Sequence, residues 1–406
     1  MDEVIVGLDI GTSKTCAVIG FLSENGQMEI AGVGISPSKG LKNGVIVNIE
    51  STIESIAKAM EDAELMAGAE VTSAYVGISN EQIQGENSRG VVAVSNRNKT
   101  ISHAEIKRVI EAAQAIVIPA ERQIIHVLSR EFQVDSQKGV KDPVGMSGVR
   151  LEAEVHIVTA SSTALINLGK AVAGAGLDCL DVVFSPIASA EAVLSRDEKE
   201  LGVALVDIGG GTTDILVYTD GGASYSAVLP VGGSHVTGDI SIGLRTPIDS
   251  AEVIKKKFAC SLIELVDATE TIEVPGVGGR APKRIFRNEL AAIVEPRMAE
   301  IMELVDRELL KSGRKNMIAA GIVLSGGGAM IDGCAELAEK IFNLPVRVGI
   351  PKDVMGLKDK VASPVYANAV GLLKYGLRNY RARSSRPKKK GLGITGSIKR
   401  FVENYF

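Results

Sequence analysis

The sequence has no tryptophan, and aromatic residues make up only 4% of its 406 residues. Burial must therefore rest on valine, isoleucine, leucine and alanine, a composition typical of buried parallel strands covered by helices. Hydrophobic residues make up 45% of the chain and charged residues 23%, which is ordinary for a globular protein. A chain of this length exceeds what one hydrophobic core usually serves, so we expect at least two lobes.

Cysteine and histidine are also scarce, at four residues each, and neither is clustered. No pair of cysteines has the spacing Cys-x-x-Cys, so neither a disulfide framework nor a zinc site is expected, and a reducing cytoplasm is the favoured compartment. The sequence has no run of about 20 apolar residues, which a spanning helix requires. Its start, MDEVIVGLDIG, is acidic and does not resemble a signal peptide. Any contact with a membrane is therefore expected to be made from its surface.

Charge is divided unevenly along the chain, although the formal net charge at pH 7 is only −4. From residue 378 to the end, nine lysines and arginines stand against one acid, Glu403, which gives this segment +8 and leaves −12 on the rest. Residues 381–396 include KKK and show no apolar periodicity, as in a flexible linker. An acidic body with a basic tail indicates that the tail has an anionic partner of its own.

Two stretches of the chain repeat the same order of features. Apolar runs at 3–10 and 15–22, which we expect to be strands, flank the turn DIGTSK. Apolar runs at 202–208 and 213–219 flank the turn DIGGGTTD in the same way. A duplication of this kind predicts two related halves that face each other.

Hydrophobic periodicity predicts further elements around these repeats. Residues 83–159 read as an inserted α+β unit, in which Ser102 and Glu105 form a capping box that opens a helix. Its size is about the smallest that a self-supporting subdomain has. Elsewhere we expect helices at 49–67, at 162–175, from about 332 and at 363–380, strands at 71–78, 179–185 and 319–325, and helical segments at both ends of 249–311.

The two turns combine an aspartate with glycines and hydroxyl side chains. Glycine accepts a positive φ angle and lets backbone N–H groups approach a phosphate without a Cβ in the way. Alone, DIGTSK is better explained as an ordinary hairpin turn, but two such turns in duplicated strand contexts indicate a phosphate site. Asp9 and Asp207 are expected to hold Mg²⁺ through its water molecules. The predicted binding residues are Asp9, Gly11, Thr12, Ser13 and Lys14 in one turn and Asp207, Gly209, Gly210, Gly211, Thr212, Thr213 and Asp214 in the other.

A third glycine-rich element is LSGGGAMIDG, which contains Gly326, Gly327 and Gly328. A glycine triplet after an apolar strand lets a flat base lie over the backbone, although a plain strand-to-helix loop explains the triplet equally well. The order of hairpin, hairpin and glycine triplet is what favours the nucleotide interpretation.

These three elements, in this order, resemble the ATP-binding signature of the actin, Hsp70 and sugar-kinase superfamily, over residues 4–378. The resemblance implies an α/β actin-like fold of two duplicated, ribonuclease-H-like lobes that bind ATP and Mg²⁺. It also implies that Glu252 and Lys255, three positions apart in DSAEVIKKKF, contact the ribose and base. A solvated helical face is the other explanation of that pair.

The early insertion resembles that of the FtsA family of bacterial cell-division proteins, and so do SPIASAEAVL, PVGGSHVTGDI and VASPVYANAVGLL. In related ATPases, a carboxylate that polarises the attacking water stands where this chain has Ser185. Because a serine cannot act as a base near neutral pH, we expect at most weak ATPase activity and predict no catalytic residue. The resemblance implies a first-lobe core of 1–82, 160–192 and 361–380, an inserted subdomain at 83–159, a second-lobe core of 193–235 and 312–360, an outer subdomain at 236–311, a linker at 381–396 and a membrane-targeting helix at 397–406.

The last ten residues, SIKRFVENYF, have helical amphipathic spacing. Ile398, Phe401, Val402, Tyr405 and Phe406 form one stripe, and the remaining charges, Lys399 and Arg400 among them, lie off it. An amphipathic helix on an anionic leaflet explains both this stripe and the basic linker. Docking onto the body or onto a partner is the alternative. Polymerisation would place many weak tails on one surface and multiply the contact.

The resemblance implies a filament-forming protein at the division site that tethers the tubulin-like protein FtsZ to the cytoplasmic face of the membrane. The FtsZ C-terminal peptide would dock on 236–311, with Arg297 and Glu300 as candidates, and four apparently spare cations there would attract it. Later division proteins would bind 83–159, and no nucleic-acid partner is expected. A sugar kinase, a pilus-assembly scaffold of the PilM type and a chaperone ATPase share the fold, and it is mainly the tail that argues against them. The pilus-assembly scaffold is the alternative that we keep. The four cations are Arg280, Lys283, Arg284 and Arg287.

Overall fold

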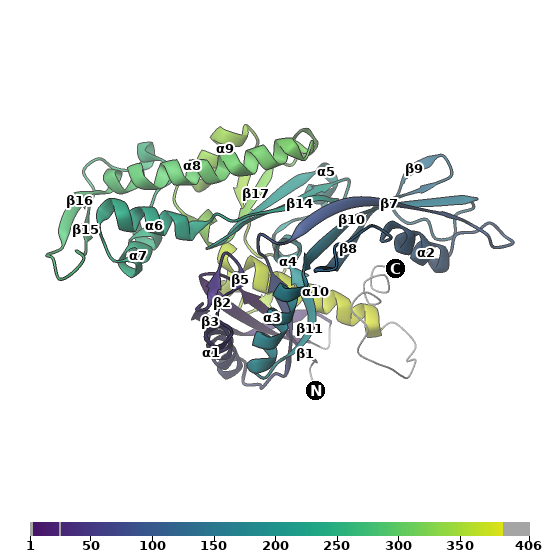
Figure 1. Ribbon diagram of the computed structural model, residues 1–406, viewed down its shortest axis with the longest axis horizontal. Coiled ribbons are helices and arrows are strands. Elements are labelled where there is room, and N and C mark those ends of the chain that lie inside the picture. The colour runs from purple at the N-terminus through teal and green to yellow at the C-terminus, as the bar shows by residue number, and fades with distance from the viewer. Residues whose placement is uncertain (1–2, 24–25, 385–406) are drawn as a thin grey trace.

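The computed structural model describes residues 3–23 and 26–384. The chain forms two stacked lobes with α4 (Ser185–Val193) and α10 (Ala367–Ser384) between them, and an inserted unit lies at one end (Figure 1). Glycine lets these two helices cross at backbone contact, because a Cβ on Gly371 would lie 1.8 Å from the carbonyl oxygen of Ala188. The centre of the molecule is therefore a tight helix pair shared by both lobes.

The first lobe is built on a mixed sheet. Its central strands β1 and β2 form the first predicted hairpin, and β1 also pairs in parallel with β6. α1 (Ile49–Ala67) covers β3 and is capped by Asn48, whose Oδ1 accepts from the Ser51 N–H at 2.9 Å. α3 (Ser162–Gly174) packs beside α1. The strand order is β11 (Asp178–Phe184), β6 (Ser73–Ile78), β1 (Glu3–Ile10), β2 (Lys14–Leu22), β3 (Met28–Pro37) and β19 (Met355–Gly356).

The second lobe repeats this topology. The strand order is β14 (Gly222–Leu229), β13 (Thr213–Thr219), β12 (Val203–Ile208), β17 (Ile322–Ser325) and β18 (Val346–Val348). As in the first lobe, the hairpin strands are antiparallel and the two strands that follow β12 across the sheet are parallel. The predicted duplication and the two-lobe fold are confirmed.

Helices cover the second sheet, and the second lobe projects beyond the sheet to one side (Figure 1). Buried side chains of α8 and α9 join those of the sheet in one hydrophobic core. A small hairpin, β15 paired with β16, lies at the far end of this extension (Figure 1). The elements are α5 (Arg196–Leu201), α6 (Gly233–Leu244), α7 (Ile248–Phe258), β15 (Thr271–Val274), β16 (Lys283–Phe286), α8 (Arg287–Lys311) and α9 (Cys334–Phe342).

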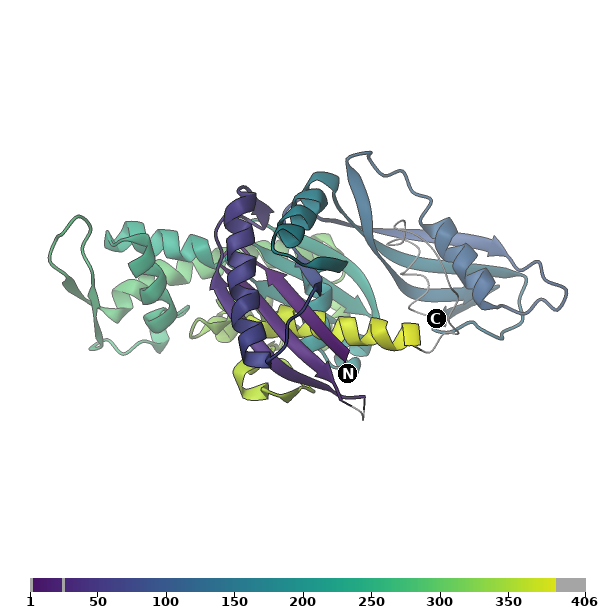
Figure 2. The ribbon, with the colours of Figure 1, turned by 90° about the horizontal axis from the view of Figure 1, so that it is seen from below.

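The inserted unit has its own sheet, helix and core. Its helix α2 (His103–Ala113) begins at the predicted capping box of Ser102 and Glu105. The strand order is β7 (Gln84–Ala93), β10 (Arg150–Ser161), β8 (Arg122–Val134) and β9 (Gln137–Val140). Figures 1 and 2 both show this unit at the end of the molecule opposite to β15 and β16.

In the sequence, the inserted unit lies between β6 and α3 of the first lobe, but in the structure it packs against the second lobe. Asn87 Nδ2 of β7 donates to the Ser224 carbonyl oxygen of β14 at 3.0 Å. His156 of β10 lies 2.7 Å from Asn87 Oδ1 through Nδ1 and 2.8 Å from Ser226 Oγ through Nε2. Because an amide oxygen only accepts, Nδ1 carries the proton and Nε2 accepts from the serine. Burial, with Arg130 and Arg314 nearby, lowers the pKa of His156 to about 4, so the ring is neutral.

Some elements differ from expectation. β3, β14 and α6 were not predicted, because their segments are rich in glycine, serine and alanine and have weak hydrophobic periodicity. The predicted start of the linker at 381 is wrong, since α10 continues to Ser384. Arginine and alanine favour helix at 381–383, and no proline follows the start of α10 until 387. Within the described residues, no helix has both the length and the apolarity needed to cross a membrane. The predicted helix at 397–406 and most of the linker lie outside the described residues.

Candidate functional site

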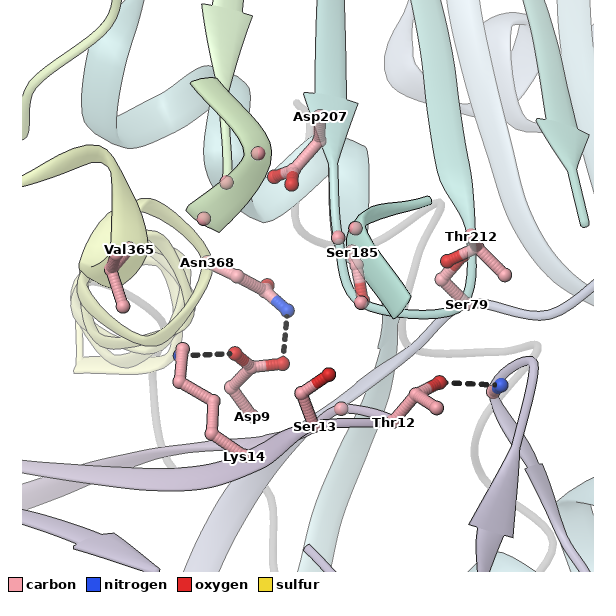
Figure 3. Close-up of a pocket in the computed structure, with 18 of the residues that line it drawn as sticks. Asp9, Thr12, Ser13, Lys14, Ser79, Ser185, Asp207, Thr212, Val365 and Asn368 are labelled. Atoms are coloured by element: carbon pink, nitrogen blue, oxygen red, sulfur yellow. Dashed lines mark hydrogen bonds and ion pairs between the residues drawn. The ribbon is translucent and has the colours of Figure 1, made fainter. Parts of the chain in front are cut away.

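A cavity lies between the lobes, where the carboxyl ends of β1, β6 and β12 meet. Ligand sites of open α/β sheets occur at this edge, because the strands end there in loops that are free to vary. Figure 3 shows Asp9 and Lys14 rising from one hairpin and Asp207 descending from the other. The wall includes most of the predicted residues, together with Gly44, Ser79, Ser185, Gly233, Lys256, Pro364, Val365 and Asn368.

In the first hairpin, both carboxylate oxygens of Asp9 are engaged. Lys14 Nζ lies 3.1 Å from Asp9 Oδ2, and Asn368 Nδ2 donates to Asp9 Oδ1 at 2.7 Å (Figure 3). Burial alone would lower the pKa of Lys14, but Asp9, together with Cys16 and Asp207, outweighs burial and raises that pKa. Thr12 Oγ1 accepts from the Gly44 N–H at 2.9 Å, which ties the turn to the following loop. The hairpin thus presents a fixed ammonium group beside a fixed carboxylate.

In the second hairpin, two carboxylates lie deep in the cleft. Ser189 Oγ of α4 donates to Asp207 Oδ2 at 2.8 Å. Burial raises the pKa of Asp207 to about 6, with a further contribution from Asp9. The Ser79 hydroxyl of the first lobe donates to Asp214 Oδ1. Burial, followed by the charge of Asp207, raises the pKa of Asp214 well above its ordinary value.

The tips of the two hairpins abut each other across the cleft. A Cβ on Gly210 would lie 1.9 Å from Ser13 Oγ, and one on Gly211 would lie 2.6 Å from Thr12 Oγ1. These glycines therefore allow the two lobes to approach. Gly211 does not line the cavity, and neither does Thr213, whose hydroxyl donates to the Val231 carbonyl oxygen at 2.8 Å. The predicted phosphate contact of the Thr213 hydroxyl is thus not supported by its position.

The glycine triplet forms a third wall, beginning at the end of β17. Gly326 has a φ of 80°, and a Cβ there would lie 2.4 Å from Asp207 Oδ1. A Cβ on Gly328 would lie 2.3 Å from Ile208 Cγ2, so these two glycines serve close packing. Gly327 lines the cavity, yet a Cβ there would meet no heavy atom within 4 Å. Its missing side chain leaves open space beside the site.

Glu252 and Lys255 of α7 also line the cavity, which favours the site interpretation over a purely solvated face. Lys255 Nζ lies 2.7 Å from Glu252 Oε2 and donates to the Gly233 carbonyl oxygen at 3.0 Å. Burial lowers the pKa of Lys255, and Glu252 opposes that change. The pair is thereby fixed at the start of α6, on the same side of the cleft as the glycine triplet.

The polar residues of the site that escaped sequence reasoning include Ser79, Ser189 and Asn368. Ser79 directly follows β6, and the rule that ligands bind at the carboxyl ends of parallel strands would have selected it. Ser189 is one turn beyond Ser185, which was predicted to lie in the site and does line the cavity. Nothing near Asn368 in the sequence signals its contact with Asp9.

The site fits a nucleotide with Mg²⁺. The charge of Asp9 helps to raise the pKa of Asp207, so a cation between these two carboxylates would stabilise the ionised form of Asp207. Both side chains offer oxygen ligands of the kind that Mg²⁺ prefers. The Oδ1 atom of Asn368 is buried and has no hydrogen-bond partner among the described residues. Together with the open space at Gly327, this atom indicates that the cleft accommodates a polar ligand.

The candidate docking residues lie on α8 and do not line the cavity. Arg297 pairs with Asp239, at 2.6 Å from Nε to Oδ2, and with Glu300. The prediction that Arg287 is a spare cation is wrong. Its guanidinium lies 2.9 Å from both Glu270 Oε2 and Asp332 Oδ2, which come from distant parts of the sequence. A docking role for Arg297 and Glu300 stays a prediction.

Two family models match the chain. The model described as cell division protein FtsA matches residues 204–371, and the model described as the SHS2 domain inserted in FtsA matches residues 80–159. The second range agrees closely with the insertion expected at 83–159. The chain is also 50% identical to the cell division protein FtsA of Pseudomonas aeruginosa, over 93% of this chain and 90% of that protein. It is 43% identical to the FtsA of Neisseria meningitidis, over 98% of both chains.

Solved structures with a similar fold are more distant in sequence. A PilM–PilN type IV pilus biogenesis complex matches with a TM-score of 0.67 at 18% identity, over 92% of this chain and 98% of that chain. MreB5 of Spiroplasma citri bound to AMPPNP matches with a TM-score of 0.56 at 15% identity, over 94% and 99%. A MamK double helical filament matches with a TM-score of 0.52 at 16% identity, over 95% and 99%. At such identities the likeness shows the actin-like fold alone.

Proposed function

The chain belongs to the FtsA family of cell division proteins, and from that premise we propose that it is an ATP-binding actin homologue of the division site. It binds ATP with Mg²⁺ between the lobes, polymerises on the cytoplasmic face of the membrane, anchors the FtsZ ring there and recruits later division proteins. The pilus-scaffold alternative is supported by fold alone, whereas identities of 43% and 50% over nearly the whole chain favour division.

The observation that carries nucleotide binding is the meeting of both hairpins and the glycine triplet in one cavity. Lys14 and the hairpin N–H groups would face the phosphates, and Asp9 and Asp207 would hold the Mg²⁺ through its waters. Glu252 and Lys255 would contact the ribose and base beside Gly327. Bound Mg²⁺ would neutralise phosphate charge and the two carboxylates together.

Slow turnover follows from Ser185, which lines the cavity but offers no carboxylate to polarise an attacking water. The nucleotide is then a clamp that fixes the lobes relative to each other. A fluorescent ATP analogue should bind in the presence of Mg²⁺, with phosphate release slow under the same conditions. Absence of binding would remove the nucleotide part of the proposal, and brisk phosphate release would remove the clamp.

Membrane anchoring rests on the sequence of 397–406, with its apolar stripe and the preceding basic linker. Full-length protein should sediment with anionic vesicles, and a version that ends at Arg386 should stay in the supernatant. Phe401→Glu should also release the protein, because it places a charge in the apolar stripe. Equal sedimentation of the full-length and shortened proteins would contradict anchoring.

Attachment of FtsZ is expected on the surface of 236–311 that includes Arg297 and Glu300. Arg297 would have to exchange part of its contact with Asp239 for a carboxylate of the partner. A synthetic FtsZ C-terminal peptide should therefore bind the protein, and Arg297→Glu should weaken it. Failure of the unaltered protein to bind the peptide at high micromolar concentration would contradict the attachment of FtsZ and favour the other actin-like classes.

A further inference from the structure

Asn368 occupies a place in the cleft that neither hairpin nor glycine triplet explains. It is the second residue of α10, it is 8% exposed, and it lines the cavity. Its Nδ2 donates to Asp9 Oδ1 at 2.7 Å, across 359 residues of sequence. Figure 3 shows its amide between Asp9 and Asp207.

Chemistry fixes the orientation of this amide. A carboxylate only accepts hydrogen bonds, so the NH₂ group of Asn368 must face Asp9 and the amide oxygen must point away from that carboxylate. The oxygen has no donor among the described residues. A buried acceptor without a donor is energetically unfavourable, so a ligand that brings a donor to this point is stabilised there.

The surrounding backbone makes room for the amide. Gly77 of β6 lies against it, and a Cβ there would lie 3.0 Å from Asn368 Nδ2 and 3.3 Å from Ser185 Oγ. On the other side, Lys14 is already committed to the second oxygen of Asp9. The Asn368 Nδ2 atom is therefore held between Gly77 and Asp9, and its buried Oδ1 atom is left without a donor among the described residues.

We propose that Asn368 is a positioning residue for the metal of the nucleotide site. Its NH₂ group holds the Asp9 carboxylate in place, and its amide oxygen accepts a hydrogen bond from a water of the Mg²⁺ hydration sphere. Water bound to Mg²⁺ is a strong donor, and partners that orient a metal's ligands typically change metal affinity by 10–100-fold. The inference rests on the proposed binding of ATP and Mg²⁺.

The position of Asn368 also connects the metal to α10. This helix crosses α4 at backbone contact through Gly371 and continues to Ser384, at the edge of the basic segment. Metal bound beside Asn368 would therefore restrain the first turn of the helix that leads to the tail. Nucleotide without metal would lack this restraint.

The test compares nucleotide binding with saturating Mg²⁺ and with EDTA. Asn368→Leu keeps the branched shape and the number of heavy atoms of the side chain and removes both polar atoms. Asn368→Ala provides a second variant if the larger leucine disturbs folding. Unaltered protein should bind ADP more tightly with Mg²⁺ than with EDTA. Both variants should lose Mg²⁺ affinity by about tenfold or more, while ADP binding in EDTA stays close to that of the unaltered protein.

A matched control comes from the same helix. Asn379 is also buried, at 3% exposure, but it contacts Tyr375 outside the cavity. Asn379→Leu should lower the melting temperature and leave the Mg²⁺ dependence of ADP binding unchanged. Hydrogen exchange gives a second readout: Mg²⁺·ADP should protect the first turn of α10 in the unaltered protein and not in Asn368→Leu.

The outcomes separate the two proposals. If unaltered protein binds no nucleotide under either condition, the proposed function fails. If it binds with a clear Mg²⁺ dependence that Asn368→Leu and Asn368→Ala retain, the positioning role of Asn368 is wrong and the proposed function stands. An equal loss of ADP affinity with and without Mg²⁺ would also overturn that role, because it would make Asn368 a general part of the pocket wall.

Discussion

The two hairpins have the same backbone but opposite electrostatic character. In the first, Asp9 pairs across the strands with Cys16, and in the second the equivalent pair is Asp207 and Asp214. Asp9 has Lys14 at 3.1 Å, whereas neither Asp207 nor Asp214 has a lysine or arginine within 4.0 Å among the described residues. A duplicated fold has thus produced one hairpin that is locally balanced and one that is strained by its own negative charge. The second hairpin gains most from a bound cation.

The largest expected effect is on the stability of the metal-free protein, when the negative charge of Asp207 is removed. Asp207 interacts with Asp9, Lys14, Asp214 and the hydroxyls of Ser189 and Ser325, and burial raises its pKa from 3.8 to about 6. A carboxyl with a raised folded-state pKa stabilises the fold below pH 4 and loses that contribution as pH rises through 6. At about 1.4 kcal/mol per pKa unit, the ionised group costs about 3 kcal/mol above pH 6.

Asp207→Asn should therefore raise the melting temperature in EDTA at pH 8, and the gain should vanish as pH falls toward 4. The measurement is thermal unfolding in EDTA across pH 4–8, with the unaltered protein beside it. The same variant should lose Mg²⁺-dependent nucleotide binding, which shows that the residue is kept for the ligand rather than for stability. A gain that is independent of pH would contradict the comparison.

The next effect has the opposite sign. Asp9→Asn leaves the buried ammonium of Lys14 without its carboxylate, and breaking such a pair destabilises a fold by about 3–5 kcal/mol when both groups are fully buried. Because the Lys14 side chain is 25% exposed, we expect about 2 kcal/mol at pH 7, measured by denaturant unfolding in EDTA. The double variant Asp9→Asn with Lys14→Met should recover most of the loss. If Asp9→Asn and Asp207→Asn change stability in the same direction, the proposed asymmetry is wrong.

A third change tests the contact between the hairpins rather than their charges. In Gly210→Val, a Cβ would collide with Ser13 Oγ, 1.9 Å away. Overpacking of this kind costs about 1–3 kcal/mol, so the lobes should separate and ADP affinity should fall by about 10–100-fold. Gly238→Ala is the control, since a Cβ there meets nothing within 4 Å and alanine favours helix. The measurement is isothermal titration with Mg²⁺·ADP. Unaltered ADP affinity in Gly210→Val would contradict the prediction and show that the tips of the hairpins are free to move apart.

The smallest expected effect concerns the hydrogen bond from α4 to the second hairpin. Ser189→Ala removes the donor to Asp207 Oδ2, which holds the pKa of Asp207 below the value that burial alone would set. The pKa of Asp207 should rise further, and stability above pH 6 should fall by about 1 kcal/mol. Ser185→Ala, one turn earlier on the same helix, should leave the pH profile in place. Identical profiles for both variants would exclude a special role for Ser189.

Local chemistry made much of this molecule predictable from sequence. The residue types in DIGTSK and DIGGGTTD are enough to predict two hairpin turns. In the same way, the capping box of Ser102 and Glu105 predicted the start of α2. The duplication followed from two similar hairpins, each of which depends only on its own strands. The placement of Gly210, Thr212 and Gly327 in one cavity then followed from the family fold.

Contacts between distant segments were not predictable in the same way. Ser79 and Asp214 are 135 residues apart, and Asn368 and Asp9 are 359 apart. A single sequence carries no local signal for such pairs, because their distance depends on how whole lobes pack. The pairing of Arg287 was hidden for the same reason, since Asp332 comes from beyond α8.

The contact between the inserted unit and the second lobe restricts how the two lobes can move. The unit is joined covalently to the first lobe through β6 and α3, but Asn87 and His156 attach it to β14 of the second. The unit therefore connects the two lobes, and the angle between them cannot change unless this contact shifts or the unit turns with them. A partner that binds the inserted unit would therefore act on the angle between the lobes, and the affinity of the cleft for nucleotide would change with it.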